Sequence, residues 1–216
     1  MLTSQQLKKA LQIYFIAGTQ DTNGSSLQLL NVLDKALTAG ITCFQYREKG
    51  ANSLKKSLER KRMARACQRL CRKHQVPFII NDGIELALEI DADGIHVGQN
   101  DEAISKVIQK NPNKIIGLSC HNVTEITYAN TFKEISYYGI GPIFPTSSKL
   151  DADKPLGLDQ LKTMVAVAKK PTVAIGGISI KNAVDIWQSN ADGLAIISAI
   201  TQAENLEETI ELLKFN

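Results

Sequence analysis

Short apolar runs alternate along the chain with longer segments in which apolar residues recur every three or four positions. The short runs have the composition of buried β-strands, and the longer segments have the period of amphipathic helices. Strict alternation of the two predicts a parallel α/β sheet. We predict eight strands, at Ile13–Ala17, Ile41–Phe44, Phe78–Ile80, Gly94–Val97, Ile115–Leu118, Tyr138–Phe144, Thr172–Ile175 and Leu194–Ile197.

Polar and glycine residues give the helices their expected limits. Ser25 or Ser26 is the expected N-cap of the first helix, and Gly40 ends it. A short leader, Thr3–Leu11, precedes the first strand. Later helices are expected at Leu54–His74, Ile84–Ile90, Glu102–Gln109, Thr124–Thr131, Leu158–Ala168, Lys181–Gln188 and Ala203–Phe215.

Seven of the predicted strands run directly into cations, carboxylates, amides, hydroxyls or paired glycines. A parallel barrel gathers the carboxyl ends of all its strands on one face, so these groups would converge into one site. Their mixture suits a polyanion and a divalent metal ion.

A four-residue motif that occurs twice in the sequence favours closure of the sheet into a barrel. Ala92-Asp93-Gly94-Ile95 and Ala191-Asp192-Gly193-Leu194 each precede a strand and resemble the same tight turn. We therefore predict one (βα)8 TIM-barrel domain over residues 1–216. The alternative, an open doubly wound sheet, would normally carry a glycine-rich fingerprint after its first strand, where this chain has only Gly18.

Composition narrows the class of protein. The 216 residues suffice for one α/β barrel and are few for two domains, and a net charge of +3 is too small to indicate a partner. No apolar run approaches a membrane span, and the N-terminus shows no secretory signal, so we expect a cytoplasmic location and no membrane partner. Four cysteines without a CxxC pair favour reduced thiols.

The ends of the second, third and fourth strands carry the strongest candidate chemistry. In extended geometry Gln45, Arg47 and Lys49 share one face, where two cations and an amide can clamp a phosphate chain. Asp82 and Asp101 follow adjacent strands and offer hard oxygen ligands for Mg²⁺. A solvated strand end and two helix caps are the simpler alternatives. Asn81 could orient a ligand or serve only as a turn residue.

The last strands offer a second anion site. Gly176-Gly177 and Ser198 follow the seventh and eighth strands, where barrels commonly bind phosphate through backbone N–H groups. The loop Pro145–Lys149 adds hydroxyls and a cation between the two sites. His96 is expected to point into the barrel or to pack rather than to catalyse. His121 could carry a proton or be a loop residue.

The helix predicted at Leu54–His74, with Asn52 or Ser53 as its cap, holds nine Lys/Arg residues and one Glu. A nucleic-acid face would be expected to interleave aromatic residues among such charges, and this helix lacks them. We therefore interpret it as a solvated outer helix, with a nucleic-acid-binding module as the alternative.

Taken in order, the motifs resemble the thiamine-phosphate synthase family over almost the whole chain. The set is highly specific, although each motif alone is weak. The matching segments are QYREK at Gln45–Lys49, IND at Ile80–Asp82, ADGIHVGQND at Ala92–Asp101, GLS at Gly117–Ser119, GIGPIFPTSSK at Gly139–Lys149, AIGGI at Ala174–Ile178 and ADGLAIISAI at Ala191–Ile200.

The resemblance implies a TIM barrel that joins a pyrimidine diphosphate to a thiazole phosphate and releases pyrophosphate. The implied partners are small phosphorylated substrates and no nucleic acid, and a homo-oligomer is left open. By position, the implied pyrimidine-diphosphate set is Gln45, Arg47, Lys49, Asn81, Ser119 and Lys149, of which Arg47, Lys49, Ser119 and Lys149 would be catalytic. The implied Mg²⁺ ligands are Asp82 and Asp101, and the implied thiazole-phosphate set is Thr146, Ser148, Gly176, Gly177, Ile197 and Ser198.

The chain departs from the family pattern at a few places. Ser148 stands where the family often has Thr, which keeps the hydroxyl, and Gly83 stands where it often has Arg, which removes one anion contact. The stretch Ser148–Gly157 is shorter than in many relatives. A thiazole tautomerase of the same fold, using His121 and no metal, is the rival enzyme, and the intact cation and carboxylate sets argue against it.

Overall fold

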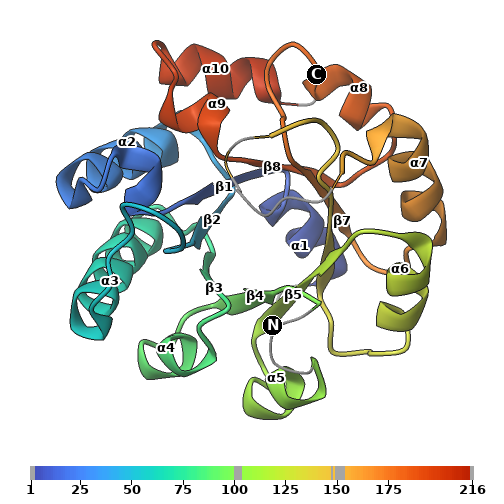
Figure 1. Ribbon diagram of the computed structural model, residues 1–216, viewed down its shortest axis with the longest axis horizontal. Helices are drawn as coiled ribbons and strands as arrows, with labels where there is room; N and C mark the ends of the chain where they lie inside the picture. Colours follow the sequence, from blue (N-terminus) through green and yellow to red (C-terminus); the bar gives the residue numbers. More distant parts are fainter. Residues whose placement is uncertain (1–2, 100–103, 147, 149–153, 215–216) are drawn as a thin grey trace.

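Eight parallel strands close into a barrel in the computed structural model, which describes residues 3–99, 104–146, 148 and 154–214. Each strand pairs with the next along the chain, and β8 pairs with β1, so the predicted TIM-barrel fold is confirmed (Figure 1). The strands are β1 (Ile13–Ala17), β2 (Cys43–Tyr46), β3 (Phe78–Asn81), β4 (Gly94–Val97), β5 (Ile115–Cys120), β6 (Tyr137–Ile140), β7 (Thr172–Ile175) and β8 (Gly193–Ile196).

Helices form a ring around the strands (Figure 1). In the described part of the chain they are α1 (Ser4–Ala10), the 3-10 turn η1 (Thr19–Thr22), α2 (Ser26–Ala39), α3 (Ser57–Lys73), α4 (Ile84–Glu89), α5 (Ile104–Lys110), α6 (Val123–Ala129), α7 (Gly157–Val167), α8 (Ala183–Trp187), α9 (Ser198–Thr201) and α10 (Leu206–Leu213). None of these described helices is both long and apolar enough to cross a membrane.

Alternation along the strands divides the core into two layers. Outward-facing residues such as Phe15, Phe44 and Tyr138 pack under the ring of helices. Inward-facing residues such as Tyr14 and Ile79 fill the barrel itself. Burial of this apolar surface on both faces of every strand is what makes an all-parallel sheet stable.

The predicted leader is helix α1, which covers the amino-terminal end of the barrel. A capping box starts it, because Gln6 N–H donates to the Thr3 hydroxyl and Thr3 N–H donates to the Gln6 side chain. Leu7 and Leu11 then pack against the barrel interior, in the same cluster as Tyr14. With that end covered, the carboxyl ends of the strands are the end from which ligands can enter.

Several predicted boundaries were wrong, each for a local reason. Asn52 and Ser53 do not cap α3, because Asn52 has a left-handed φ of 59° and the Ser53 hydroxyl donates to the Gly50 carbonyl at 2.7 Å. The helix begins three residues after Leu54, at Ser57. The sixth strand ends at Ile140, well before the predicted end, since Pro142 has no N–H for a ladder.

The last predicted helix is confirmed over a shorter range. Within Ala203–Phe215 the helix is α10, Leu206–Leu213, and the short α9 is a separate helix that lies before this segment. Asn205 starts α10 as its N-cap by accepting a hydrogen bond from Glu208 N–H. The Ser25 cap and the Gly40 stop of α2 are confirmed, Gly40 having a φ of 100°.

The repeated Ala-Asp-Gly turn makes the same hydrogen bond at both of its positions. The Asp93 carboxylate accepts a hydrogen bond from Phe78 N–H at 2.9 Å, and the Asp192 carboxylate accepts one from Thr172 N–H at 2.9 Å. Each aspartate therefore binds the first residue of the preceding strand. The glycine that follows allows close backbone approach, since a Cβ on Gly193 would lie 1.9 Å from the Leu11 carbonyl oxygen.

We expect Gly193→Ala to lower the free energy of unfolding by about 1–3 kcal/mol, because backbone atoms must move to admit the methyl group. Gly83→Ala is the matched control, since the nearest atom to its Cβ would be a side-chain carbon at 3.4 Å. Urea unfolding of both variants provides the measurement. Equal stability of the two variants would contradict the close packing at Gly193.

Candidate functional site

A cavity of about 160 Å³ lies at the carboxyl ends of the strands. Every described residue that the sequence predicted for the site lines it, so the predicted convergence of the strand ends is confirmed. Those residues are Gln45, Arg47, Lys49, Asn81, Asp82, Ser119, Thr146, Ser148, Gly176, Gly177, Ile197 and Ser198. The other two, Asp101 and Lys149, lie outside the described residues.

One side of the cavity is charged and is built by β2 and β3. Gln45 is buried within β2, and Arg47 and Lys49 follow at the strand's end. The Lys49 ammonium lies 3.0 Å from the Asp82 carboxylate, which follows β3. Two cations and a carboxylate therefore share one wall of the cavity, as predicted.

Asp82 is placed by its backbone rather than by a capping role. Its φ of 59° is left-handed, a conformation that Asp tolerates better than most residues, and its N–H donates to the His96 carbonyl at 2.9 Å. The residue at the N-cap of α4 is Gly83, so the simpler interpretation of Asp82 as a helix cap is wrong. The turn leaves its carboxylate on the cavity wall.

The opposite side of the cavity contains the paired glycines after β7. Gly176 and Gly177 have φ values of 99° and 65°. A Cβ on Gly176 would lie 2.6 Å from the Pro142 Cα, and one on Gly177 would lie 2.5 Å from the Pro145 carbonyl oxygen. Only glycine satisfies both the backbone conformation and the packing, so the loop presents backbone to the cavity.

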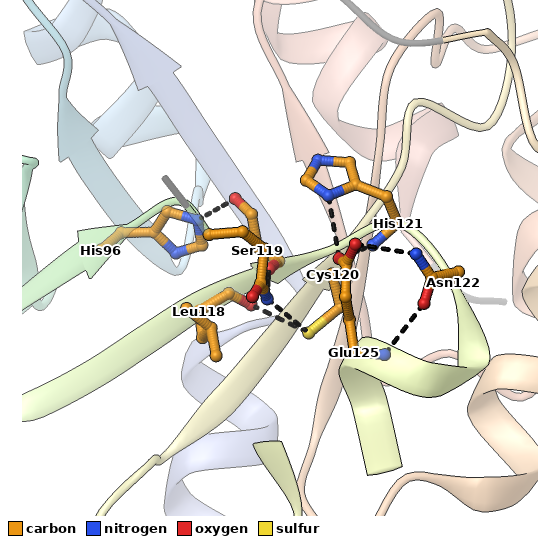
Figure 2. A network of polar contacts seen from close by, with 8 residues as sticks. His96, Leu118, Ser119, Cys120, His121, Asn122 and Glu125 are labelled. Atoms are coloured by element: carbon orange, nitrogen blue, oxygen red, sulfur yellow. Dashed lines mark hydrogen bonds and ion pairs between the residues drawn. The ribbon is translucent and has the colours of Figure 1, made fainter. Parts of the chain in front are cut away.

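His121 lies on the cavity rim at the end of β5 and is held by Glu125 of α6. The Glu125 carboxylate accepts from His121 N–H at 2.7 Å and lies 3.0 Å from the His121 Nδ1 (Figure 2). Asn122 caps α6 and also donates to Glu125 at 2.7 Å. The arrangement fixes the orientation of the imidazole through contacts that all lie within four residues of the sequence.

The floor of the cavity holds residues that the sequence did not single out. The Gln45 amide donates to the Tyr14 hydroxyl at 2.8 Å, and that hydroxyl lies 2.7 Å from the hydroxyl of Tyr137. The Tyr137 hydroxyl lies 2.9 Å from His96 Nδ1, and His96 Nε2 lies 2.9 Å from the Ser119 hydroxyl.

The expectation that His96 points into the barrel is confirmed, and Figure 2 shows its ring beside Ser119. Tyr14 was missed because aromatic residues in strands usually indicate apolar packing. Tyr137 was missed because the predicted sixth strand began one residue later, at Tyr138. Strand parity, once the bounds are known, places both on the inward face.

Comparisons with known proteins agree with this geometry. Residues 13–200 match the family model described as thiamine monophosphate synthase. The chain is 50% identical over 207 residues to thiamine-phosphate synthase of Latilactobacillus sakei subsp. sakei (strain 23K), covering 95% of this chain and 92% of the relative. It is 53% identical over 206 residues to thiamine-phosphate synthase of Listeria welshimeri serovar 6b, covering 94% of this chain and 98% of the relative.

A solved structure is similar over nearly the same extent. Thiamine phosphate pyrophosphorylase from Pyrococcus furiosus superposes with a TM-score of 0.84 at 32% identity, covering 96% of this chain and 95% of that one. The enzyme of that title from Bacteroides thetaiotaomicron has a TM-score of 0.60 at 16% identity, which supports the fold alone.

Cys120 lies between Ser119 and His121 but is not expected to be a nucleophile. Burial raises the pKa of its thiol to about 12, so the thiolate is scarce at neutral pH. We expect native protein at pH 8 to resist iodoacetamide at Cys120, and Cys120→Ala to retain activity within about threefold. Mass spectrometry of alkylated native and urea-unfolded protein measures the difference. Rapid alkylation of native Cys120 would overturn this assignment.

Proposed function

The chain belongs to the thiamine monophosphate synthase family, and we propose that its cavity joins a pyrimidine diphosphate to a thiazole phosphate. It is thus a transferase whose product is thiamine phosphate. The supporting observation is that cations and a carboxylate lie on one wall of the cavity while a glycine loop with neighbouring hydroxyls lies on the other. A single site can therefore hold two anionic substrates side by side.

The charged wall is assigned to the diphosphate of the pyrimidine substrate. Arg47 and Lys49 provide two cations at the end of β2, with Asn81 beside them at the end of β3. Charge-assisted hydrogen bonds of this kind strengthen as negative charge grows on the leaving diphosphate. Gln45 and Ser119, deeper in the cavity, would hold the pyrimidine ring. Lys149 joins this set by the family resemblance.

The glycine wall is assigned to the phosphate of the thiazole substrate. Gly176 and Gly177 bring backbone close to the cavity, and Thr146, Ser148 and Ser198 add hydroxyls there. Ile197 contributes apolar surface for the thiazole ring. Backbone N–H groups and hydroxyls are the usual phosphate contacts after the last two strands of such barrels.

The chemistry proposed is a dissociative substitution that uses no protein nucleophile. The bond from the pyrimidine methylene carbon to the diphosphate oxygen breaks, and the electron pair leaves with diphosphate. The electron-rich aminopyrimidine spreads the positive charge that remains, and the thiazole nitrogen then attacks that carbon. The protein contributes positioning and electrostatic stabilisation, which together can supply many kcal/mol.

The donor set on the charged wall fits Mg²⁺. Asp82 offers a carboxylate that faces the cavity, and Mg²⁺ in enzymes of this kind typically takes one or two carboxylates together with substrate phosphate oxygens. No cluster of three or more potential metal-binding side chains occurs among the described residues, which is compatible with a metal held partly by substrate. Asp82, with Asp101 by resemblance, would hold the ion, which would neutralise diphosphate charge when bound.

Direct synthesis is the test of this function. The purified chain is incubated with the pyrimidine diphosphate, the thiazole phosphate and Mg²⁺, and thiamine phosphate and pyrophosphate are measured. We expect the two products to form in equal amounts. Failure to form thiamine phosphate while both substrates remain intact would contradict the proposal.

We expect Asp82→Asn to raise the Mg²⁺ concentration required for half-maximal rate by about tenfold or more, since an amide binds Mg²⁺ more weakly than a carboxylate. Asp91→Asn is the control, because Asp91 is a surface carboxylate paired with Lys114 and lies outside the cavity. Titration of MgCl₂ against initial rate measures both. An unchanged requirement in Asp82→Asn would remove Asp82 from the metal site.

The two ends of the cavity should separate in kinetics. We expect Ser198→Ala to raise KM for the thiazole phosphate by about tenfold, as expected for loss of a hydrogen bond to a charged group. Ser119→Ala should instead raise KM for the pyrimidine diphosphate. Each variant serves as the control for the other, and effects of equal size on both substrates would show that the two ends are wrongly assigned.

A further inference from the structure

The hydrogen-bonded chain across the cavity floor links two residues already assigned to the pyrimidine substrate. It runs from Gln45 on β2 through Tyr14 on β1, Tyr137 on β6 and His96 on β4 to Ser119 on β5. All five side chains line the cavity. Five strands thus contribute one polar side chain each to a single connected network.

Two glycines lie beside this hydrogen-bonded network, where any larger residue would crowd its rings. A Cβ on Gly117 would lie 2.2 Å from the Tyr137 ring, and one on Gly139 would lie 3.1 Å from His96 Cε1. Both glycines lie in regularly paired strands: Gly117 of β5 is opposite Tyr137 of β6, and Gly139 of β6 is opposite Ser119 of β5. Glycine weakens a strand interior, so its presence at these two positions indicates that the aromatic rings need the space.

Counting hydrogens favours one direction of donation along this network. Burial raises the pKa of the Tyr14 and Tyr137 phenols, so each keeps its single hydrogen. The Gln45 amide already donates to Tyr14, so the arrangement that satisfies every bond of the network sends the Tyr14 hydrogen to Tyr137 and the Tyr137 hydrogen to His96 Nδ1. In that arrangement His96 carries its hydrogen on Nε2 and donates it to the Ser119 oxygen.

We propose that Tyr14, Tyr137 and His96 are positioning residues that set the hydrogen-bonding polarity of Gln45 and Ser119 toward the aminopyrimidine. The proposal rests on the function proposed above. With its amide nitrogen engaged by Tyr14, Gln45 is oriented so that its carbonyl oxygen is the group left to accept a hydrogen bond. With its oxygen occupied by His96, Ser119 has its own hydrogen left to donate.

This polarity matches the substrate's chemistry. An aminopyrimidine presents an exocyclic amine, which donates, and ring nitrogens, which accept. A fixed acceptor at Gln45 and a fixed donor at Ser119 therefore recognise it in one orientation, with the reactive methylene directed toward the charged wall. A site built to pair polar groups also rejects rings that leave those groups unpaired.

The direction of the hydrogen bonds in this network can be tested without substrate. The protein has three histidines, and comparison with His96→Gln assigns the His96 signals in ¹⁵N-histidine NMR spectra. We expect the Nε2–H tautomer in the wild-type protein and in Tyr138→Phe, and a mixture of tautomers in Tyr137→Phe. Tyr138 is the matched control because its hydroxyl binds Asn130 outside the barrel, at 2.9 Å. An Nδ1–H tautomer in the wild-type protein would overturn the proposed direction.

Kinetics test the positioning role. We expect Tyr137→Phe to lower kcat/KM for the pyrimidine diphosphate about five- to tenfold, the range for a neutral hydrogen bond, while KM for the thiazole phosphate stays within twofold. In a Ser119→Ala background the same substitution should cost less than twofold, because residues of one network are not additive. Equal factors in the two backgrounds, or a Tyr137→Phe enzyme that matches Tyr138→Phe, would overturn the role.

The two proposals fail in different ways. If the wild-type protein makes no thiamine phosphate, the proposed function is overturned, and with it the role toward the aminopyrimidine. The NMR result would still decide the direction of the hydrogen bonds in the network. A wild-type chain that is active, with Tyr137→Phe indistinguishable from it, would overturn the positioning role alone.

Discussion

Pairing of β8 with β1 is the constraint on which the rest of this structure depends. Phe15 lies opposite Phe44 on one side and Ile196 on the other, so β1 has no free edge. Closure brings the carboxyl ends of all eight strands to one rim. It also divides every strand into an inward and an outward face, because side chains alternate. The candidate site is a consequence of both effects.

The inward face of the barrel contains both apolar and polar side chains, and the polar ones must be paired. Toward the amino-terminal end it is apolar and is covered by Leu7 and Leu11 of α1. Toward the other end it becomes polar, with Gln45, His96 and Ser119 joined through two tyrosine hydroxyls. Buried polar groups are costly when unpaired, so this network must be connected to be stable, and connection also fixes which way each group points.

The cavity combines this rigid floor with two different walls. On one wall the Lys49 ammonium and the Asp82 carboxylate lie 3.0 Å apart, and on the other Gly176 and Gly177 expose backbone. A diphosphate leaving group needs concentrated positive charge, whereas a phosphate that only binds can be held by N–H groups and hydroxyls. The difference between the walls supports the proposed reaction between two anionic substrates.

The sequence by itself determined the barrel, the order of its strands and most of the predicted residues that line the candidate cavity. Apolar runs and strand-end polar residues are local signals, and parallel topology turns residues such as Arg47, Asp82 and Gly176 into neighbours without further information. Some local signals were not read from the sequence. The Leu54–His74 helix starts late because Asn52 has a left-handed φ and the Ser53 hydroxyl donates to Gly50. The leader is a helix that a capping box of Thr3 and Gln6 starts.

Only the tertiary structure decided the network on the cavity floor. Tyr14 and Tyr137 lie 123 positions apart in sequence, and nothing local distinguishes a tyrosine that packs from one whose hydroxyl meets another across a barrel. His121 is different, because its orientation depends on Glu125 only four positions along the chain. Hydrogen bonds are directional and short-ranged, so they are decided only when the fold has brought their donors and acceptors to within about 3 Å.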